Sequence, residues 1–176
     1  KNSKIILLKK TTNGQASSLY KIKKIVKKNS PIFVTSTDFC FLYDKKKLNE
    51  YLKKNINIIF VCKPNKEMKK FKNNFGWVRT DKKKNVIKIS CKKKINGNSK
   101  NDKIILGAFA FSSFEVFTNG YKKMLKHKRL VNNEYYIDIL MDEIKKYEDV
   151  KIIEVKKFIN WGTPFEFEKN KNNILK

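Results

Sequence analysis

Several patterns that would define a common protein class are missing from this sequence. No stretch of about 18 uninterrupted apolar residues is present, which argues against a membrane-spanning helix. The apolar run Ile5–Leu8 is too short for a signal peptide, so we expect none. The sequence also has no Walker loop, no zinc-spaced cysteine pair and no serine–histidine–carboxylate arrangement. Its one histidine, His127, lies near a lysine-rich helix end and is expected at the surface rather than acting as a base.

Paired cysteines are missing as well. Cys40, Cys62 and Cys91 are odd in number and far apart in the chain. This spacing suits neither a redox motif nor a disulfide framework. We therefore expect reduced thiols and a cytoplasmic location.

Arginine is scarce in spite of a net charge of +26. Of the 42 basic residues, only Arg79 and Arg129 are arginine, which leaves 40 lysines. Proteins that read phosphates or base edges favour the planar, bidentate guanidinium group. Lysine enrichment that accompanies abundant asparagine and isoleucine instead suggests a compositional bias, so nucleic acid is an unlikely partner. A polyanion-binding module driven by net charge remains an alternative of a different class.

The chain is nevertheless long and apolar enough to fold. It has 176 residues, of which 40% are hydrophobic and 12% aromatic, and this suits one domain over residues 1–176. Short β-rich runs alternate with amphipathic stretches, which predicts an α/β fold with a mixed, mostly parallel sheet. Two runs around a polar tetrapeptide predict an antiparallel hairpin, Phe75–Thr80 with Asn85–Cys91.

The predicted elements are as follows. Other strands are expected at Ile5–Leu8, Pro31–Ser36, Ile56–Cys62, Ile104–Phe111 and Ile152–Val155. Helices are expected at Gln15–Lys28, Lys45–Lys53, Ser113–Lys126 and Glu134–Tyr147, with a last short helix after Pro164.

Asp38 is the first candidate for chemistry. It follows the strand predicted at Pro31–Ser36, and open α/β sheets bind their ligands at the carboxyl ends of strands. Magnesium is commonly held by one or two carboxylates together with substrate phosphates. The alternative is that Asp38 only caps the following turn.

Three further positions could contact a ligand. The turn Asn13-Gly14-Gln15 precedes a helix, where glycine and free amide groups allow a ligand to approach the backbone, although an ordinary helix cap is the favoured interpretation of these residues alone. Lys92 begins a basic run and could hold a phosphate as a point charge, or simply face solvent. Glu134 is predicted to open a helix, where acidic residues are often only dipole partners.

The order and spacing of these segments, from about Thr11 to Glu168, resemble the sugar-phosphate nucleotidyltransferases. That family has a Rossmann-like fold of the glycosyltransferase-A type, a three-layer sandwich. The resemblance is carried by the base-contacting segment Asn13-Gly14-Gln15-Ala16, the strand ending in the magnesium-binding Asp38, the hairpin around Phe75–Ile89, the glycine strand Leu106–Phe111, the segment Glu134-Tyr135-Tyr136 with Asp138, and the turn Trp161-Gly162-Thr163-Pro164.

The sequence departs from the family pattern in three ways. The glycine-rich loop with its arginine and catalytic lysine is absent, so the chain resembles a fragment, or a homologue without its first βα unit. Cys91 stands where a glutamate that contacts sugar hydroxyls is expected, which leaves Lys92 matched but its acidic neighbour missing. Asn160 stands where the second metal-binding aspartate is expected, and an amide oxygen would bind Mg²⁺ more weakly.

The resemblance implies a nucleotidyltransferase. Such an enzyme transfers a nucleoside monophosphate from a nucleoside triphosphate to a sugar phosphate or similar phosphorylated metabolite, and releases pyrophosphate. A role in making precursors of surface polysaccharides would follow. The implied residues are Asp38 and Asn160 for Mg²⁺, Asp38 and Lys92 for catalysis, Gly14, Gln15 and Asp38 for the nucleotide, and Gly107, Glu134 and Lys92 for the acceptor. A degenerate, non-catalytic relative is the alternative, and the chain could form a homo-oligomer.

Overall fold

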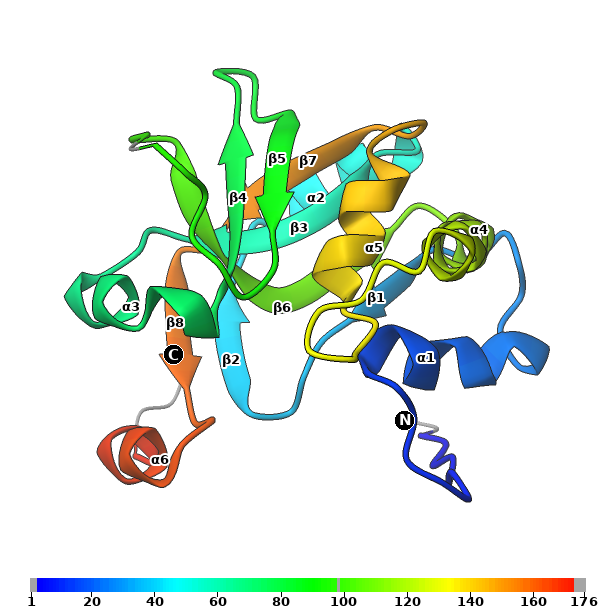
Figure 1. Ribbon diagram of the computed structural model, residues 1–176, viewed down its shortest axis with the longest axis horizontal. Coiled ribbons are helices and arrows are strands. Elements are labelled where there is room, and N and C mark those ends of the chain that lie inside the picture. Colours follow the sequence, from blue (N-terminus) through cyan, green and yellow to red (C-terminus); the bar gives the residue numbers. More distant parts are fainter. Residues whose placement is uncertain (1–2, 98, 173–176) are drawn as a thin grey trace.

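A six-stranded sheet runs through the molecule and a two-stranded sheet lies beside it (Figure 1). The structure is a computed structural model that describes residues 3–97 and 99–172. The strands are β1 (Ile32–Val34), β2 (Phe39–Leu42), β3 (Asn57–Cys62), β4 (Gly76–Thr80), β5 (Val86–Ser90), β6 (Asp102–Phe111), β7 (Val150–Glu154) and β8 (Lys157–Asn160). The helices are α1 (Gln15–Tyr20), α2 (Lys45–Lys53), α3 (Lys66–Lys70), α4 (Phe114–Lys126), α5 (Ile137–Ile144) and α6 (Pro164–Asn170), with 3-10 turns at Lys21–Lys24 and Lys72–Asn74.

The long strand β6 organises the main sheet, whose order is β5-β4-β6-β3-β7. On one side β6 pairs with β3. On the other side it pairs first with β4, as far as Ile105, and then with β1, from Phe109 onward. Gly107 lies between these two ladders, in the left-handed backbone region with φ of 77°. The edge of β6 thus changes partner at a glycine.

The prediction of a mostly parallel sheet is wrong. β3 and β7 are parallel, whereas the pairings of β6 with β1, β3 and β4, and of β4 with β5, are antiparallel. The near-continuous apolar run in β3 reports burial on both faces of the sheet. It carries no information about the direction of the neighbouring strand, which explains the error. The predicted β4–β5 hairpin is confirmed.

Helices cover both faces of the main sheet, so the predicted three layers and the α/β class are confirmed (Figure 1). Successive residues of β3 point to opposite faces. Ile59 and Val61 join a core formed with α1, α4 and α5, whereas Ile58 and Phe60 join a second core with α2 and the aromatic side chains of β2. None of the described helices is long and apolar enough to cross a membrane.

Three predicted elements differ from the structure. The helix predicted at Gln15–Lys28 is α-helical only over Gln15–Tyr20 and continues as the 3-10 turn Lys21–Lys24. The strand predicted at Ile5–Leu8 is not formed, and Ile5 and Leu7 are 86% and 88% exposed because no described strand pairs with them. The helix predicted from Glu134 begins only at Ile137. Asn132 and Asn133 both have positive φ and form a tight two-residue turn between Val131 and Glu134, so Glu134 precedes the helix.

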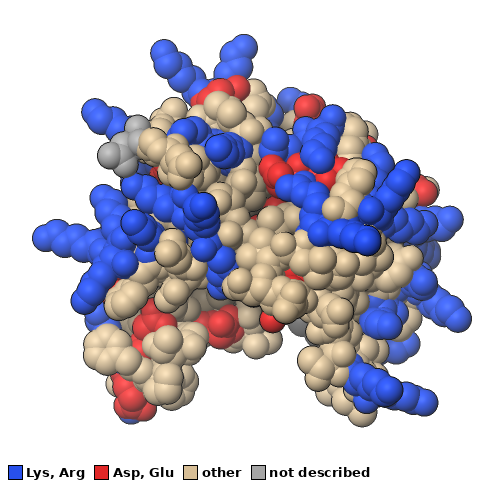
Figure 2. Space-filling model, viewed as in Figure 1, with Lys and Arg blue, Asp and Glu red and all other residues tan. Residues whose placement is uncertain are grey.

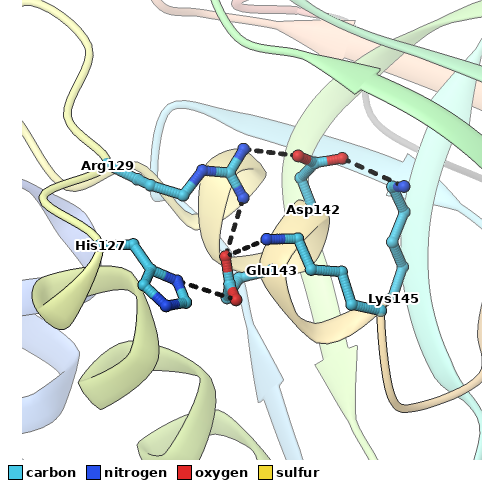
Figure 3. Close-up of polar contacts among 6 residues, drawn as sticks. His127, Arg129, Asp142, Glu143 and Lys145 are labelled. Carbon is cyan, nitrogen blue, oxygen red and sulfur yellow. Dashed lines mark hydrogen bonds and ion pairs between the residues drawn. The ribbon is translucent and has the colours of Figure 1, made fainter.

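The junction of α4 and α5 is held by ion pairs (Figure 3). Arg129, just after α4, contacts Asp142 at 2.6 Å and Glu143 at 3.0 Å on α5. The Glu143 side chain is only 2% exposed and also accepts a hydrogen bond from Lys146 at 2.8 Å. His127 lies 3.3 Å from the other oxygen of Glu143 and is 47% exposed, in agreement with its predicted surface position. These ion pairs fix the position of α5 relative to α4. The first turn of α5 borders the candidate site.

Candidate nucleotide and metal site

The side-chain oxygens of two candidate metal ligands lie close to Gly162. A β-carbon built on this glycine would lie 3.2 Å from an Asp38 carboxylate oxygen and 3.3 Å from the Asn160 amide oxygen. The two oxygens therefore face one point, although 122 positions separate Asp38 from Asn160 in the chain (160 − 38). The predicted pair of metal ligands is brought together by the fold.

The two-stranded sheet explains this convergence. β2 pairs with β8 antiparallel, and Phe39 lies opposite Asn160. The amide of Trp161 also donates a hydrogen bond to the carbonyl oxygen of Asp38, with a length of 2.7 Å. Neither strand was predicted, because both are short and one follows a turn-like segment. The strand that precedes Asp38 ends at Val34, so Asp38 is presented by the β1–β2 connection and not directly by the main sheet.

The donor set suits Mg²⁺. This ion is usually bound by one or two protein oxygens, substrate phosphates and water, and rarely by a full protein cage. The exposed Asp38 carboxylate and the Asn160 amide oxygen provide such a partial set. Within residues 3–97 and 99–172, no group of three histidine, cysteine, aspartate or glutamate residues could hold a metal. A site completed by phosphate oxygens is therefore the kind that these residues fit.

The Gly14 turn forms a second part of the site. Gly14 has φ of 99°, and a β-carbon there would lie 2.8 Å from the backbone nitrogen of Tyr135. The Tyr135 amide donates to the Asn13 carbonyl, and the Ala16 amide donates to the Tyr135 carbonyl. These contacts require glycine at position 14 and place it directly against Glu134.

Gly14, Gln15 and Glu134 line one open hollow of about 470 Å³ at the start of α1. The remaining lining residues are Leu8, Lys10, Thr11, Thr12 and Ser18. Figure 2 shows the surface hollowed along its lower edge, between α6 on one side and the segment leading to α1 on the other. The structure thus joins residues that the sequence assigned separately to nucleotide and acceptor.

Gly107 lies close to the segment that carries Asp38. It sits where β6 changes partner from β4 to β1. The Phe39 ring would lie 3.8 Å from a β-carbon built on Gly107. Phe39 is the immediate neighbour of Asp38. Gly107 therefore lies near Asp38, and no contact among the described residues joins it to Glu134.

Lys92 lies beside the first turn of α5. Its ammonium group donates to the Asn74 carbonyl oxygen at 2.9 Å and lies 5.7 Å from the centre of the Tyr136 ring. Burial, followed by a hydrogen bond to Glu134, raises the pKa of Tyr136 to about 12. Lys92 is thus connected to Glu134 through Tyr136, whereas no contact among the described residues joins it to Asp38.

Cys91 is covered by Asp138. Burial and then the Asp138 charge raise the pKa of the Cys91 thiol to about 12, and the two side chains share a hydrogen bond. Burial also raises the pKa of Asp138 to about 6, while the positive charge of Lys92 opposes that rise. The Asp138 carboxylate lies directly over Gly76, where a side chain would collide with it. Asp138, on α5, therefore brings a carboxylate next to Cys91, the position where the family pattern has a glutamate.

Glu166 is the residue of this region that sequence reasoning missed. It lies on α6 and accepts a hydrogen bond of 2.6 Å from the side chain of Asn160. The spacing Thr163-x-x-Glu166 is that of a helix capping box, and this signal could have placed the side chain at the start of α6. Figure 2 shows a group of acidic atoms over β8 and α6, on a face otherwise dominated by lysine.

The fold is shared with solved nucleotidyltransferases. A nucleoside-diphosphate-sugar pyrophosphorylase from Vibrio cholerae RC9 matches 92% of this chain with a TM-score of 0.69 and 20% identity. A UDP-glucose pyrophosphorylase complexed with UDP-glucose matches 92% with a TM-score of 0.71 and 14% identity. The chain has a nucleotidyltransferase fold. HddC from Yersinia pseudotuberculosis, complexed with GMP-PN, matches 93% of the chain with a TM-score of 0.59 and 16% identity.

The likeness covers only part of each solved structure, and sequence identity is low. The chain spans 66% of the Vibrio protein, 62% of the UDP-glucose pyrophosphorylase and 63% of HddC. No protein-family model matches the chain, and a search of curated proteins finds no significant match. At these identities the nucleotidyltransferase likeness establishes the fold, and the chemistry has to be argued from the site.

Proposed function

We propose that the protein is a nucleotidyltransferase that transfers a nucleoside monophosphate from a nucleoside triphosphate to a phosphorylated sugar or similar metabolite. The observation that carries the proposal is the convergence of the Asp38 and Asn160 oxygens on one point beside Gly162. The solved structures that share this fold include enzymes named for nucleotide-sugar chemistry. A cytoplasmic role in making precursors of surface polysaccharides is part of the proposal.

The proposed roles follow the placement of the residues. Gly14 and Gln15 contact the nucleotide in the hollow at the start of α1, where backbone can approach a base closely. Glu134 and Gly107 line the acceptor pocket, and Lys92 exchanges its bond to Asn74 for a bond to the acceptor phosphate. Asp38 and Asn160 are the residues that would hold Mg²⁺, which would neutralise charge on the triphosphate.

The reaction is an in-line displacement at the α-phosphorus. A phosphate oxygen of the acceptor forms the new bond, the bond between the α-phosphorus and the bridging oxygen breaks, and pyrophosphate leaves with the electron pair. Mg²⁺, when bound, neutralises phosphate charge. The chain positions the two substrates and lowers their mutual repulsion, and no covalent intermediate with the protein is required. Lys92 contributes a positive charge to the acceptor phosphate.

The proposal is tested by release of pyrophosphate. The full protein is offered each nucleoside triphosphate with a panel of phosphorylated sugars and alcohols, with and without Mg²⁺. We expect Mg²⁺-dependent release for one combination, and loss of about a hundredfold or more in Asp38→Ala, since a metal ligand is removed. Asp149→Ala is the matched control, because Asp149 is an exposed aspartate outside the site. Equal activity of Asp38→Ala and Asp149→Ala would refute the role of Asp38.

Two rivals predict different binding. A non-catalytic relative, favoured by Cys91 and Asn160, would bind one nucleotide in calorimetry without turnover. A polyanion-binding module would bind any nucleic acid strand with a steep salt dependence. Figure 2 shows lysines spread over much of the visible face rather than along one groove, which favours the transferase over the polyanion binder.

A further inference from the structure

We infer that Glu166 positions Asn160 and supplies the second negative charge of the cation site; the inference rests on the proposed function. Asn160 by itself offers a neutral amide oxygen, a weak ligand for a divalent cation. Glu166 contacts that amide directly, at 2.6 Å between the side-chain nitrogen and a carboxylate oxygen. The two residues act as one unit.

The hydrogen bonds fix the orientation of the amide. A carboxylate can only accept hydrogen bonds, so the Asn160 side chain must turn its NH₂ group toward Glu166. The amide oxygen then faces the other way, where it accepts from the Gly162 backbone amide at 3.3 Å. A β-carbon built on Gly162 would lie 3.2 Å from the Asp38 carboxylate, 3.3 Å from this amide oxygen and 3.8 Å from the amide nitrogen, so the oxygen is the amide atom nearer to that point. Glu166 therefore keeps the Asn160 oxygen turned toward Gly162 and near the Asp38 carboxylate, instead of letting the amide rotate.

Glu166 is itself held from several directions. Its second carboxylate oxygen accepts from the Thr163 hydroxyl at 3.0 Å, and its backbone amide donates to that hydroxyl at 3.2 Å. At the other end of α6, the Asn170 side chain donates to the Asn160 carbonyl at 3.0 Å. The helix is thus fixed to β8 at both ends, and the position of the Glu166 carboxylate follows from this attachment.

The contact also gives a physical reason for asparagine at position 160. An aspartate there would bring a second carboxylate to about the 2.6 Å that now separates the amide nitrogen from Glu166. Two ionised carboxylates at that separation repel strongly. With asparagine the clash becomes a hydrogen bond, and the site keeps two negative charges, on Asp38 and Glu166. The second negative charge, which the family pattern has at position 160, is in this chain carried by Glu166.

The test measures binding of Mn²⁺ alone to the full protein, by the loss of the free-ion electron paramagnetic resonance signal at fixed ionic strength. Glu166→Gln removes one charge with little change of shape, and we expect about tenfold weaker binding. Glu168→Gln is the matched control: it lies on the same helix, 64% exposed in an ion pair with Lys171, and should bind like wild type. Circular dichroism checks that each variant keeps its fold.

A charge swap separates positioning from simple helix capping. In the double variant Asn160→Asp with Glu166→Gln, the charge returns to position 160 and the new glutamine donates to it. We expect Mn²⁺ affinity within about threefold of wild type. If Glu166 only caps α6, Glu166→Gln binds Mn²⁺ as well as Glu168→Gln does, and this result overturns the inference.

The same titration distinguishes failure of the inference from failure of the proposed function. If wild type binds Mn²⁺ and Asp38→Asn does not, while Glu166→Gln is unaffected, the cation site stands and only the role of Glu166 is wrong. If wild type binds no Mn²⁺, either alone or with a nucleoside triphosphate, the cation site itself is wrong and both proposals are rejected.

Discussion

The Asp38 carboxylate and the Asn160 amide both border the space above Gly162, with oxygens 3.2 Å and 3.3 Å from the position of an absent β-carbon. Glycine at this position leaves the space open. Because Gly162 is exposed, its lack of a side chain contributes little to the core and instead keeps two polar groups accessible.

Filling that space should weaken cation binding. In Gly162→Ala the new methyl group meets both oxygens, so we expect about tenfold weaker Mn²⁺ binding in the same resonance titration. The midpoint of thermal unfolding should shift by no more than a few degrees, since the residue is exposed. A folded variant that binds Mn²⁺ as tightly as wild type would show that the oxygens do not share a ligand at this point.

Gly14→Ala should destabilise the turn before α1 and weaken nucleotide binding. The added β-carbon would lie 2.8 Å from the Tyr135 nitrogen and 2.9 Å from its carbonyl oxygen, on a backbone with φ of 99°. We expect a loss of about 2–3 kcal/mol in urea denaturation, from strain and collision together.

Gly97→Ala is the control for Gly14→Ala. Gly97 also has positive φ, 77°, but among the described residues, its chain neighbours aside, no atom lies within 4 Å of an added β-carbon. It should therefore cost only about 1 kcal/mol, the contribution of backbone strain. Equal losses for the two variants would mean that the contact with Tyr135 is not what requires glycine at position 14.

Stability should fall as the pH rises through the titration of Asp138. Burial raises the pKa of this carboxyl from 3.8 to about 6, so the folded protein holds the proton more tightly than the unfolded chain. The stabilising contribution is complete below pH 3.8 and is lost as the pH passes about 6. Asp138→Asn imitates the protonated form and removes this dependence.

Urea denaturation between pH 4 and 7 measures the effect of Asp138. We expect Asp138→Asn to match wild type at pH 4 and to be more stable by about 1–2 kcal/mol at pH 7. Subtracting the two proteins at each pH cancels the contributions of the other titrating groups. A stability difference that does not change with pH would contradict a raised pKa.

Removing Arg129 should destabilise the α4–α5 junction shown in Figure 3. Glu143 is almost fully buried; burial would raise its pKa, but hydrogen bonds from Lys146 and Arg129 lower it to about 2. We expect Arg129→Ala to cost about 2–4 kcal/mol at pH 7, because a buried charge loses a partner. Lys145→Ala, which removes a 3.5 Å contact with Asp142, should cost less than about 1 kcal/mol.

The pH dependence of the Arg129 effect gives a second check. Since the folded pKa of Glu143 is depressed, its stabilising contribution is present above about pH 4.5 and disappears as the pH falls through about 2. The difference between wild type and Arg129→Ala should therefore shrink on acidification. A difference that is the same at pH 7 and pH 2.5 would show that the loss comes from packing rather than from charge.

Much of the fold could be predicted because local patterns report local structure. The helix predicted at Lys45–Lys53 has those same bounds, with Asp44 as its cap, and the β4–β5 hairpin follows from apolar runs around a polar tetrapeptide. Strand direction could not be predicted, because burial on both faces gives the same apolar run in either direction. The strands β2 and β8 were missed because each is only four residues long.

The candidate site divides in the same way. Asp38 and Gly14 are candidates from residue type and position along the chain, whereas Asn160 and Gly107 are candidates only through the family resemblance, which also requires the close approach of Asp38 to Asn160. The contacts of Glu166 with Asn160 and of Asp138 with Cys91 depend on how α6 and α5 dock, which no local pattern encodes.

The sequence by itself determined the α/β class and the positions of most helices, because these depend on periodicity and side-chain chemistry, and the family resemblance added Asp38 and Asn160 as candidate cation ligands. Only the tertiary structure decided which carboxylates accompany them. Distance between side chains is set by strand pairing and helix docking, and it was this geometry that placed Glu166 beside Asn160 and Asp138 beside Cys91.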